Sequence, residues 1–170
     1  MKDGPVVLIG PMGAGKTSIG KKAARRLDVP FADTDKLVVA RHGPVAEIFA
    51  ARGEEGFREL EHDVVAEALA GSGVVSLGGG AVLHPETRGL LADLPVVLLT
   101  VTAEAVAPRL GGTVRPLLAE EGIVAWRRIA AARDPLYREL ADLVLDTSHR
   151  PVSSVVDDLV TWTDRRRTAP

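Results

Sequence analysis

Short apolar runs alternate along this chain with longer segments in which apolar residues recur every three or four positions. Four runs have the length and composition of buried parallel strands: Val6–Ile9, Val74–Leu77, Val96–Val101 and Leu143–Leu145. A fifth, weaker strand is predicted over Val29–Asp33, where the run ends in polar residues. Helical spacing covers the segments Ser18–Leu27, Val45–Arg52, Glu55–Ala70, Pro85–Leu91, Ala103–Leu110, Ile123–Leu140 and Val152–Thr163. The alternation predicts an α/β fold, a doubly wound parallel sheet with helices on both faces.

Glycine-rich or acidic stretches occur at the ends of three predicted strands. Gly10 opens a glycine-rich loop after the first strand, Asp33-Thr34-Asp35 ends the second, and Gly78-Gly79-Gly80 follows the third. In open α/β sheets, ligands bind beyond the carboxyl ends of the strands. We therefore expect these three stretches to border one crevice.

The glycine-rich loop, Gly10-Pro-Met-Gly-Ala-Gly-Lys16-Thr17, fills every fixed position of the phosphate-binding loop motif. Between a strand and a helix, such glycines let successive N–H groups turn toward a polyphosphate. Lys16 is expected to reach the outer phosphates and Thr17 to bind Mg²⁺. A chance match in an ordinary turn is the alternative, and the strand and helix on either side argue against it. The loop predicts binding of a nucleoside triphosphate.

Asp33 and Asp35 stand on either side of one residue at a predicted strand end. In a strand-like conformation their side chains point the same way. One carboxylate is then expected to address hydrated Mg²⁺ and the other an acceptor hydroxyl. The alternative is a helix cap without chemistry, with Asp35 preceding a helix that starts at Lys36.

Two arginines on predicted helices, Arg58 and Arg133, are candidates for an anion grip. An arginine on a helix is more often a solvated ion-pair partner, and Glu54 or Glu61 could pair with Arg58 in that way. If both arginines reach the crevice, they form a forked grip on a carboxylate.

Two further glycine-containing segments suggest close contact with a ligand. The Gly78–Gly80 stretch lets the backbone pass near a ligand, whereas a flexible turn would seldom need three glycines. The segment from about 111 to 122 carries Arg115 between glycines and suits a mobile lid that brings a cation to the transferring phosphoryl group. An ordinary loop with a solvated arginine is the alternative.

Composition places few further limits on the function. The chain has 170 residues, 46% of them hydrophobic, a formal net charge of −2 and no cysteine. These values predict one domain over residues 1–163, and no attraction to nucleic acid or to an anionic membrane. The absence of cysteine excludes disulfides and thiolate catalysis. With only a short apolar run at the N-terminus, we expect a cytoplasmic protein, with a monomer as the default state. The tail, residues 164–170, is expected to be disordered, with Arg165-Arg166-Arg167 solvated.

These motifs, in this order, resemble the shikimate kinase family from about Val6 to Val160. The phosphate-binding loop is shared by many proteins, but the full set with its spacings is specific to this family. The matching pieces are the loop itself, Asp33-Thr34-Asp35, Ile48-Phe49, Gly53-Glu-Glu-Gly-Phe-Arg58, Ser76-Leu-Gly-Gly-Gly80, Arg115-Pro-Leu-Leu, Arg133 with Tyr137, and Arg150-Pro151. A gluconate kinase-like enzyme and a catalytically silent nucleotide-binding protein of the same fold are the alternatives.

The resemblance implies a three-layer P-loop kinase fold of the nucleoside monophosphate kinase type, with a five-stranded parallel sheet of order 2-3-1-4-5. It implies ATP-dependent phosphorylation of the shikimate 3-hydroxyl, with Asp35, Lys16 and Arg115 as catalytic residues. Shikimate-binding positions would be Asp35, Phe49, Phe57, Arg58, Gly79, Gly80 and Arg133. ATP-binding positions would be Gly13, Ala14, Gly15, Lys16, Thr17, Ser18, Arg109, Arg115 and Arg150. Mg²⁺ would be held by Thr17 and, through water, by Asp33.

Overall fold

Five parallel strands form the centre of the fold, in a computed structural model that describes residues 4–110 and 122–168. The strands are β1 (Val6–Ile9), β2 (Phe31–Asp33), β3 (Val74–Ser76), β4 (Val96–Thr100) and β5 (Leu143–Asp146). They pair in the order β2-β3-β1-β4-β5, and every pair is parallel. The predicted fold class and strand order are confirmed. β2 begins at Phe31 rather than at the expected Val29.

The described helices follow the predicted helical segments, except that α2 is an additional helix and α3 joins two predicted ones. They are α1 (Lys16–Arg26), α2 (Thr34–His42), α3 (Val45–Leu69), α4 (Pro85–Leu91), α5 (Ala103–Leu110), α6 (Ile123–Leu140) and α7 (Val152–Thr168), with a 3-10 turn η1 (Ala81–Leu83). α3 spans two predicted helices, and Gly53 interrupts its helical geometry with a φ of 69° and a ψ of −175°. None of the described helices has the length and apolar character that a membrane span requires.

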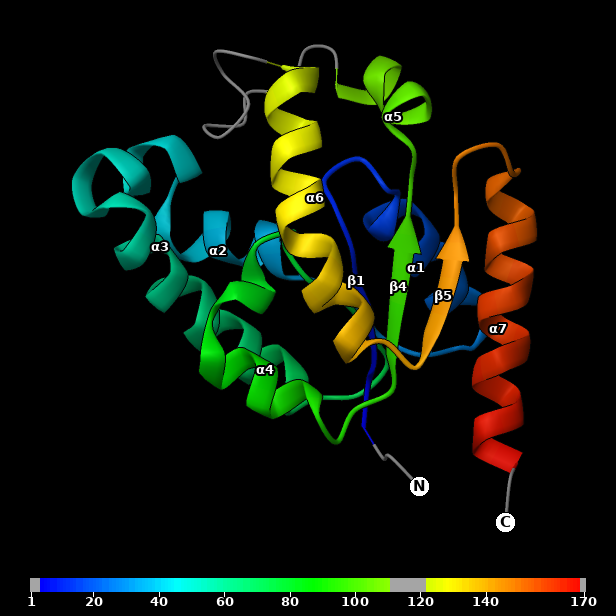
Figure 1. Cartoon of the computed structure of the whole chain (residues 1–170). Coiled ribbons are helices and arrows are strands. Elements are labelled where there is room, and N and C mark those ends of the chain that lie inside the picture. The colour runs from blue at the N-terminus through cyan, green and yellow to red at the C-terminus, as the bar shows by residue number, and fades with distance from the viewer. Residues whose placement is uncertain (1–3, 111–121, 169–170) are drawn as a thin grey trace.

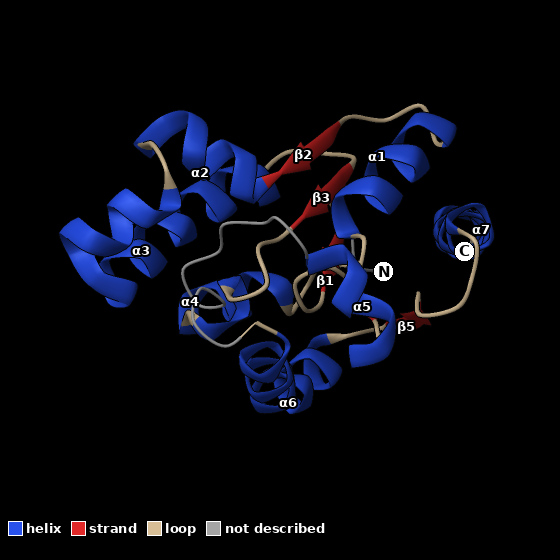
Figure 2. Ribbon diagram, turned by 90° about the horizontal axis from the view of Figure 1, so that it is seen from above, coloured by secondary structure: helices blue, strands red, loops and turns tan. Residues whose placement is uncertain are grey.

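Helices cover both faces of the sheet, which gives three layers. α1 and α7 lie on one face, and α3, α4 and α6 on the other (Figures 1 and 2). Side chains alternate between the faces along each strand, as the pleat requires. Leu8 and Leu99 belong to the core under α1 and α7, whereas Val7 and Leu98 belong to the core under α3, α4 and α6. The sheet is therefore buried on both sides, which explains why its strands are apolar throughout.

The register of the strands places the candidate residues at the carboxyl end of the sheet. Asp33 of β2 stands opposite Ser76 of β3, and Ser76 stands opposite Leu8 of β1. Because the strands are parallel, the segments that follow them leave the sheet at the same end. The three stretches that the sequence predicts to border a crevice therefore lie at the same end of the sheet.

The C-terminal helix continues beyond its expected end at Thr163. α7 runs to Thr168, so residues 164–168, which were expected to belong to the tail, continue this helix. The Arg166 guanidinium lies over the Trp162 ring, 4.9 Å from its centroid. The last turn carries three arginines, and cations there interact favourably with the carbonyl end of the helix.

Two helical glycines provide a test of the packing. A β-carbon at Gly20 in α1 would lie 2.7 Å from Phe31 and 2.9 Å from Leu8, whereas one at Gly89 in α4 would meet nothing within 4 Å. Alanine is preferred to glycine in helices by about 1 kcal/mol, but overpacking a core typically costs about 1–3 kcal/mol. We expect Gly20→Ala to lower the free energy of unfolding and Gly89→Ala to raise it, as measured by urea denaturation. Equal effects of the two substitutions would contradict this account.

Candidate active site

The phosphate-binding loop connects β1 to α1 at the carboxyl edge of the sheet. Gly10, Gly13 and Gly15 have φ angles of 142°, 80° and 92°, which residues with side chains rarely adopt. The Lys16 ammonium donates hydrogen bonds to the carbonyl oxygens of Gly10 at 2.8 Å and Pro11 at 3.0 Å. α1 begins at Lys16, so the N–H groups of its first turn have no helical partners. The loop therefore has the geometry of an anion site at a helix N-terminus.

A hydroxyl and a carboxylate meet beside this loop. The Thr17 hydroxyl donates to a carboxylate oxygen of Asp33 at 2.6 Å, and Asp33 is buried. The other carboxylate oxygen of Asp33 accepts from the Lys36 N–H at 3.3 Å. Thr17 and Asp33, predicted from the sequence as a metal-binding pair, are in direct contact.

The expectation that Asp33 and Asp35 share a strand conformation is wrong. Asp33 ends β2 with a φ of −119° and caps α2, which begins at Thr34. Asp35 lies in the first turn of α2, so the cap is Asp33 and not Asp35. An aspartate at the end of a strand can cap a helix at once, because its side chain accepts an N–H of the first turn. The two carboxylates are separated by this change from strand to helix.

The triglycine loop, residues 78–80, follows β3 and packs against charged side chains. A β-carbon at Gly78 would lie 2.5 Å from an Asp35 carboxylate oxygen and 2.6 Å from a Glu61 carboxylate oxygen. The Gly78 N–H donates to the buried Thr34 hydroxyl at 3.1 Å. This side of the loop thus brings Asp35 and Glu61 together from α2 and α3.

The other two glycines of the triglycine loop lie next to the two candidate arginines. A β-carbon at Gly80 would lie 2.1 Å from an Arg58 guanidinium nitrogen, and one at Gly79 would lie 3.6 Å from an Arg133 guanidinium nitrogen. Arg133 is 6% exposed. The structure thus brings Arg58 and Arg133 to the same loop from two different helices.

Arg58 is held by two carboxylates on its own helix. Its Nη1 lies 2.6 Å from Glu61, and its Nη2 lies 3.6 Å from Glu54. The interpretation of Arg58 as an ion-pair partner is correct, but the pair with Glu61 is not solvated, since the two side chains are 12% and 2% exposed. The Arg58 Nε is buried and has no hydrogen-bond partner among the described residues.

Glu61 is a buried carboxylate that sequence reasoning treated only as a possible surface partner. Burial raises the pKa of Glu61 above its ordinary value, and the neighbouring Arg58 offsets part of this increase. Asp35 raises the pKa further, whereas Arg133 lowers it. The spacing of three residues from Arg58 on a helix indicated the contact, but not its burial.

Two phenylalanines flank Arg58. The rings of Phe49 and Phe57 lie 4.9 Å apart between centroids, and the Arg58 guanidinium lies 5.1 Å from the centroid of Phe57. Phe57 is buried within a small core that also contains Val38. The segment of α3 around Gly53 therefore supplies an apolar surface beside the charged groups.

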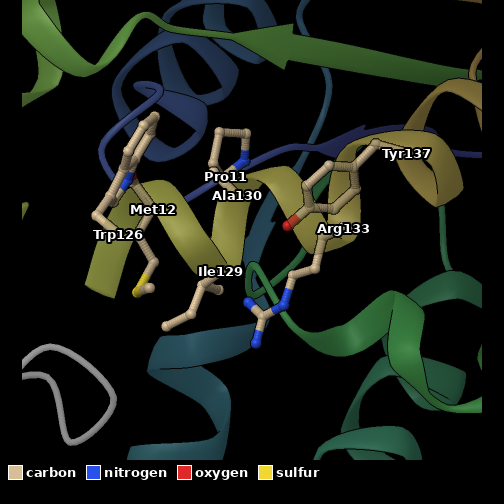
Figure 3. A pocket seen from close by; sticks show the side chains of 7 residues that line it. All are labelled: Pro11, Met12, Trp126, Ile129, Ala130, Arg133 and Tyr137. Carbon is tan, nitrogen blue, oxygen red and sulfur yellow. The ribbon is translucent and has the colours of Figure 1, made fainter. Parts of the chain in front are cut away.

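α6 contributes residues to both parts of the crevice. Figure 3 shows Arg133 and Tyr137 on this helix near Pro11 and Met12 of the phosphate-binding loop. The Tyr137 hydroxyl donates to the Gly79 carbonyl oxygen, a contact that the sequence did not predict. α6 thus runs beside both the phosphate-binding loop and the charged groups around the triglycine loop.

The remaining predicted residues differ in their placement. Arg109 donates to the carbonyl oxygens of Gly13 and Thr147, each at 3.1 Å, so it lies against the phosphate-binding loop. Arg150 instead donates to the Asp158 carboxylate at 2.6 Å, on α7. Arg115 and the predicted lid, apart from Gly122, lie outside the described residues.

Comparisons with known proteins agree on one family. A family model for shikimate kinase matches residues 12–164. A shikimate kinase from Saccharopolyspora erythraea is 49% identical over 158 residues, which is 91% of this chain and 90% of that protein. The structure of shikimate kinase from Acinetobacter baumannii in complex with shikimate is 31% identical, with a TM-score of 0.90 over 98% of this chain and 96% of that one. A gluconokinase from Sinorhizobium meliloti has a TM-score of 0.64 at 20% identity, over 97% of this chain and 94% of that one, a likeness of fold alone.

The raised pKa of Glu61 predicts a pH-dependent contribution to stability. Between the ordinary value of 4.5 and the raised one, the folded state binds more protons than the unfolded state. The contribution of Glu61 to the free energy of unfolding therefore decreases as the pH rises through this window. Glu61→Gln removes the titrating group, so we expect the stability of wild type relative to this variant to fall from pH 4.5 upward. Urea denaturation of both proteins at several pH values measures it, and a constant or rising difference would contradict the prediction.

Proposed function

This chain belongs to the shikimate kinase family, and we propose that it transfers the γ-phosphoryl group of ATP to the 3-hydroxyl of shikimate. The observation that carries the proposal is the acceptor part of the crevice. There, two arginines and a carboxylate from three different helices surround the triglycine loop next to the phosphate-binding loop. A ring acid with hydroxyl groups matches this combination of charges.

Arg58 and Arg133 hold the shikimate carboxylate. Both guanidinium groups are largely buried, and a charge-assisted pair with a carboxylate is stronger there than at the surface. The Nε of Arg58 has no hydrogen-bond partner within residues 4–110 and 122–168, which supports this role because a bound carboxylate can accept its N–H. Glu61 fixes the guanidinium of Arg58, and Phe49 and Phe57 bound the ring on its apolar side.

The phosphate-binding loop holds ATP, with Mg²⁺ beside it. The hydroxyl and carboxylate oxygens of Thr17 and Asp33 are the donor type that Mg²⁺ prefers, and their contact next to the loop fits such a site. Few protein ligands are usual for this ion, which retains several waters and binds phosphate oxygens. When bound, Mg²⁺ neutralises charge on the phosphates. Lys16, already placed over the loop, adds a second positive charge.

Asp35 acts on the acceptor hydroxyl. It lies in the first turn of α2 beside Gly78, on the acceptor side of the crevice. In the transfer, the bond between the γ-phosphorus and its bridging oxygen breaks while the hydroxyl oxygen bonds to that phosphorus. Asp35 orients the hydroxyl and accepts its proton late in the step, and ADP leaves. Such a reaction depends mainly on in-line positioning and charge neutralisation.

The other roles implied by the family complete the proposal. Arg115 brings a positive charge to the γ-phosphate from the lid, while Arg109 and Arg150 flank the adenine. The contact of Arg109 with the phosphate-binding loop supports its part. We propose a monomeric, cytoplasmic enzyme without a nucleic-acid or membrane partner, as the composition suggests.

Acceptor specificity tests the function directly. We expect ADP release, measured in a coupled assay with ATP and Mg²⁺, to be fast with shikimate and at background with gluconate. The reason is that gluconate lacks the ring that the phenylalanines and the triglycine loop enclose. Preferred use of gluconate would favour the related small-molecule kinase, and nucleotide binding without turnover would favour a silent protein.

Asp35→Asn tests the acceptor chemistry. The amide keeps the size of the side chain but cannot accept the proton, and general base catalysis contributes typically about 10²–10⁴-fold. We expect kcat to fall at least about 100-fold while ADP binding, measured by calorimetry, is unchanged. Asp63→Asn on the exposed face of α3 is the matched control and should behave as wild type. Near-normal kcat in Asp35→Asn would contradict the role of Asp35.

A further inference from the structure

α6 is hydrogen-bonded to both ligand-binding loops through side chains that the reaction does not use. Near its start, the Trp126 indole N–H donates to the carbonyl oxygen of Met12 in the phosphate-binding loop at 2.8 Å. Near its end, about three turns later, the Tyr137 hydroxyl donates to the carbonyl oxygen of Gly79. Figure 3 shows both aromatic side chains, with Arg133 beside Tyr137.

Both aromatic side chains are buried, and their hydrogen bonds to the two loop carbonyls are partly buried. Trp126 is 5% exposed and Tyr137 is 1% exposed. Burial raises the pKa of the Tyr137 hydroxyl, with Arg133 offsetting part of this increase, so the group keeps its proton and acts as a donor. Loss of either donor leaves a partly buried carbonyl without this partner, which costs free energy.

Tyr137 also fixes the position of Gly79 relative to Arg133, two residues of the proposed acceptor site. Arg133 lies one turn before Tyr137 on the same face of α6. Its guanidinium lies close to Gly79, the residue whose carbonyl Tyr137 holds. The hydroxyl therefore fixes the triglycine loop relative to the helix that carries one arm of the carboxylate grip.

We propose that Tyr137 and Trp126 are positioning residues of this enzyme, Tyr137 for the acceptor part of the site and Trp126 for the phosphate-binding loop. Neither residue touches the reacting atoms in this assignment. Trp126 acts through the Met12 carbonyl, whereas Tyr137 acts through the Gly79 carbonyl and through its interaction with Arg133. α6 is the common support of the two loops. In-line transfer depends on the spacing of these loops, because a misplacement of about 1 Å can cost about 100-fold in rate. The proposal rests on the proposed function.

The assignment predicts opposite patterns in two conservative variants. In Tyr137→Phe, the lost hydroxyl frees the triglycine loop, and we expect the KM for shikimate to rise about tenfold, the effect of one hydrogen bond of about 1.4 kcal/mol. The KM for ATP should stay within about twofold. In Trp126→Phe we expect the reverse, with an increase in the KM for ATP and little change for shikimate.

A matched control separates positioning from simple stability. Thr163 in α7 is 3% exposed, and its hydroxyl donates to the Leu159 carbonyl oxygen at 2.8 Å, away from the crevice. Thr163→Val removes a buried hydroxyl whose acceptor lies one turn earlier in the same helix, and it should leave both KM values unchanged. Thermal denaturation of all three variants, beside steady-state kinetics, makes the comparison.

The possible outcomes distinguish a failure of the positioning roles from a failure of the proposed function. If wild type does not phosphorylate shikimate, the proposed function fails. If wild type is active but Tyr137→Phe and Trp126→Phe leave both KM values unchanged, as expected for Thr163→Val, the contacts are merely structural and the inference is overturned. Equal increases in both KM values in both variants would overturn it as well, because the two loops would then not be positioned separately.

Discussion

The absence of side chains in the triglycine loop is the constraint on which the acceptor site depends. A β-carbon at Gly78 would overlap the Asp35 carboxylate, and one at Gly80 would overlap the Arg58 guanidinium. Charged groups from α2 and α3 can therefore approach the end of β3 only because the residues there are glycines without side chains. At Gly79, by contrast, a β-carbon would lie 3.6 Å from Arg133 of α6, which is an ordinary contact. Three helices that are distant in sequence thus meet at one short loop.

This close approach places like and unlike charges in a region with little water. Glu61 is almost completely buried, and removing a carboxylate from water costs several kcal/mol unless it is paired. The contact with Arg58 offsets that cost only in part, as the raised pKa of Glu61 shows. Such a pair adds little to stability by itself. The main effect of the pair is to orient Arg58, because a guanidinium held on one side by a carboxylate presents its remaining N–H groups in a defined direction.

The sequence predicted most of the fold, because each strand and helix has a local pattern. It also identified the phosphate-binding loop, whose residues are contiguous. The family resemblance implied a shared Mg²⁺ site for Thr17 and Asp33, but not the direct hydrogen bond between them. The sequence-based prediction failed where the rule applied to a pair of residues, such as the alternation of side chains along a strand, holds only in one backbone conformation. The spacing of Asp33 and Asp35 was interpreted as strand geometry, yet α2 begins between them. The burial of Glu61 and the bond from Tyr137 to the triglycine loop depend on how α3 and α6 pack, which no local pattern determines.

The phosphate-binding loop and the proposed acceptor site therefore differ in how closely they identify the ligands of the protein. The phosphate-binding part is one continuous segment, so it can be preserved in proteins with different acceptors, and it indicates a nucleotide and no more. The acceptor part is assembled from α2, α3, α6 and the triglycine loop, so a change of acceptor requires coordinated changes in several elements. α6 is bonded to both parts, through Met12 at one end and Gly79 at the other. A shift of this helix would alter the donor and acceptor sites together, which favours changes of specificity that leave α6 in place and act through the side chains facing the triglycine loop.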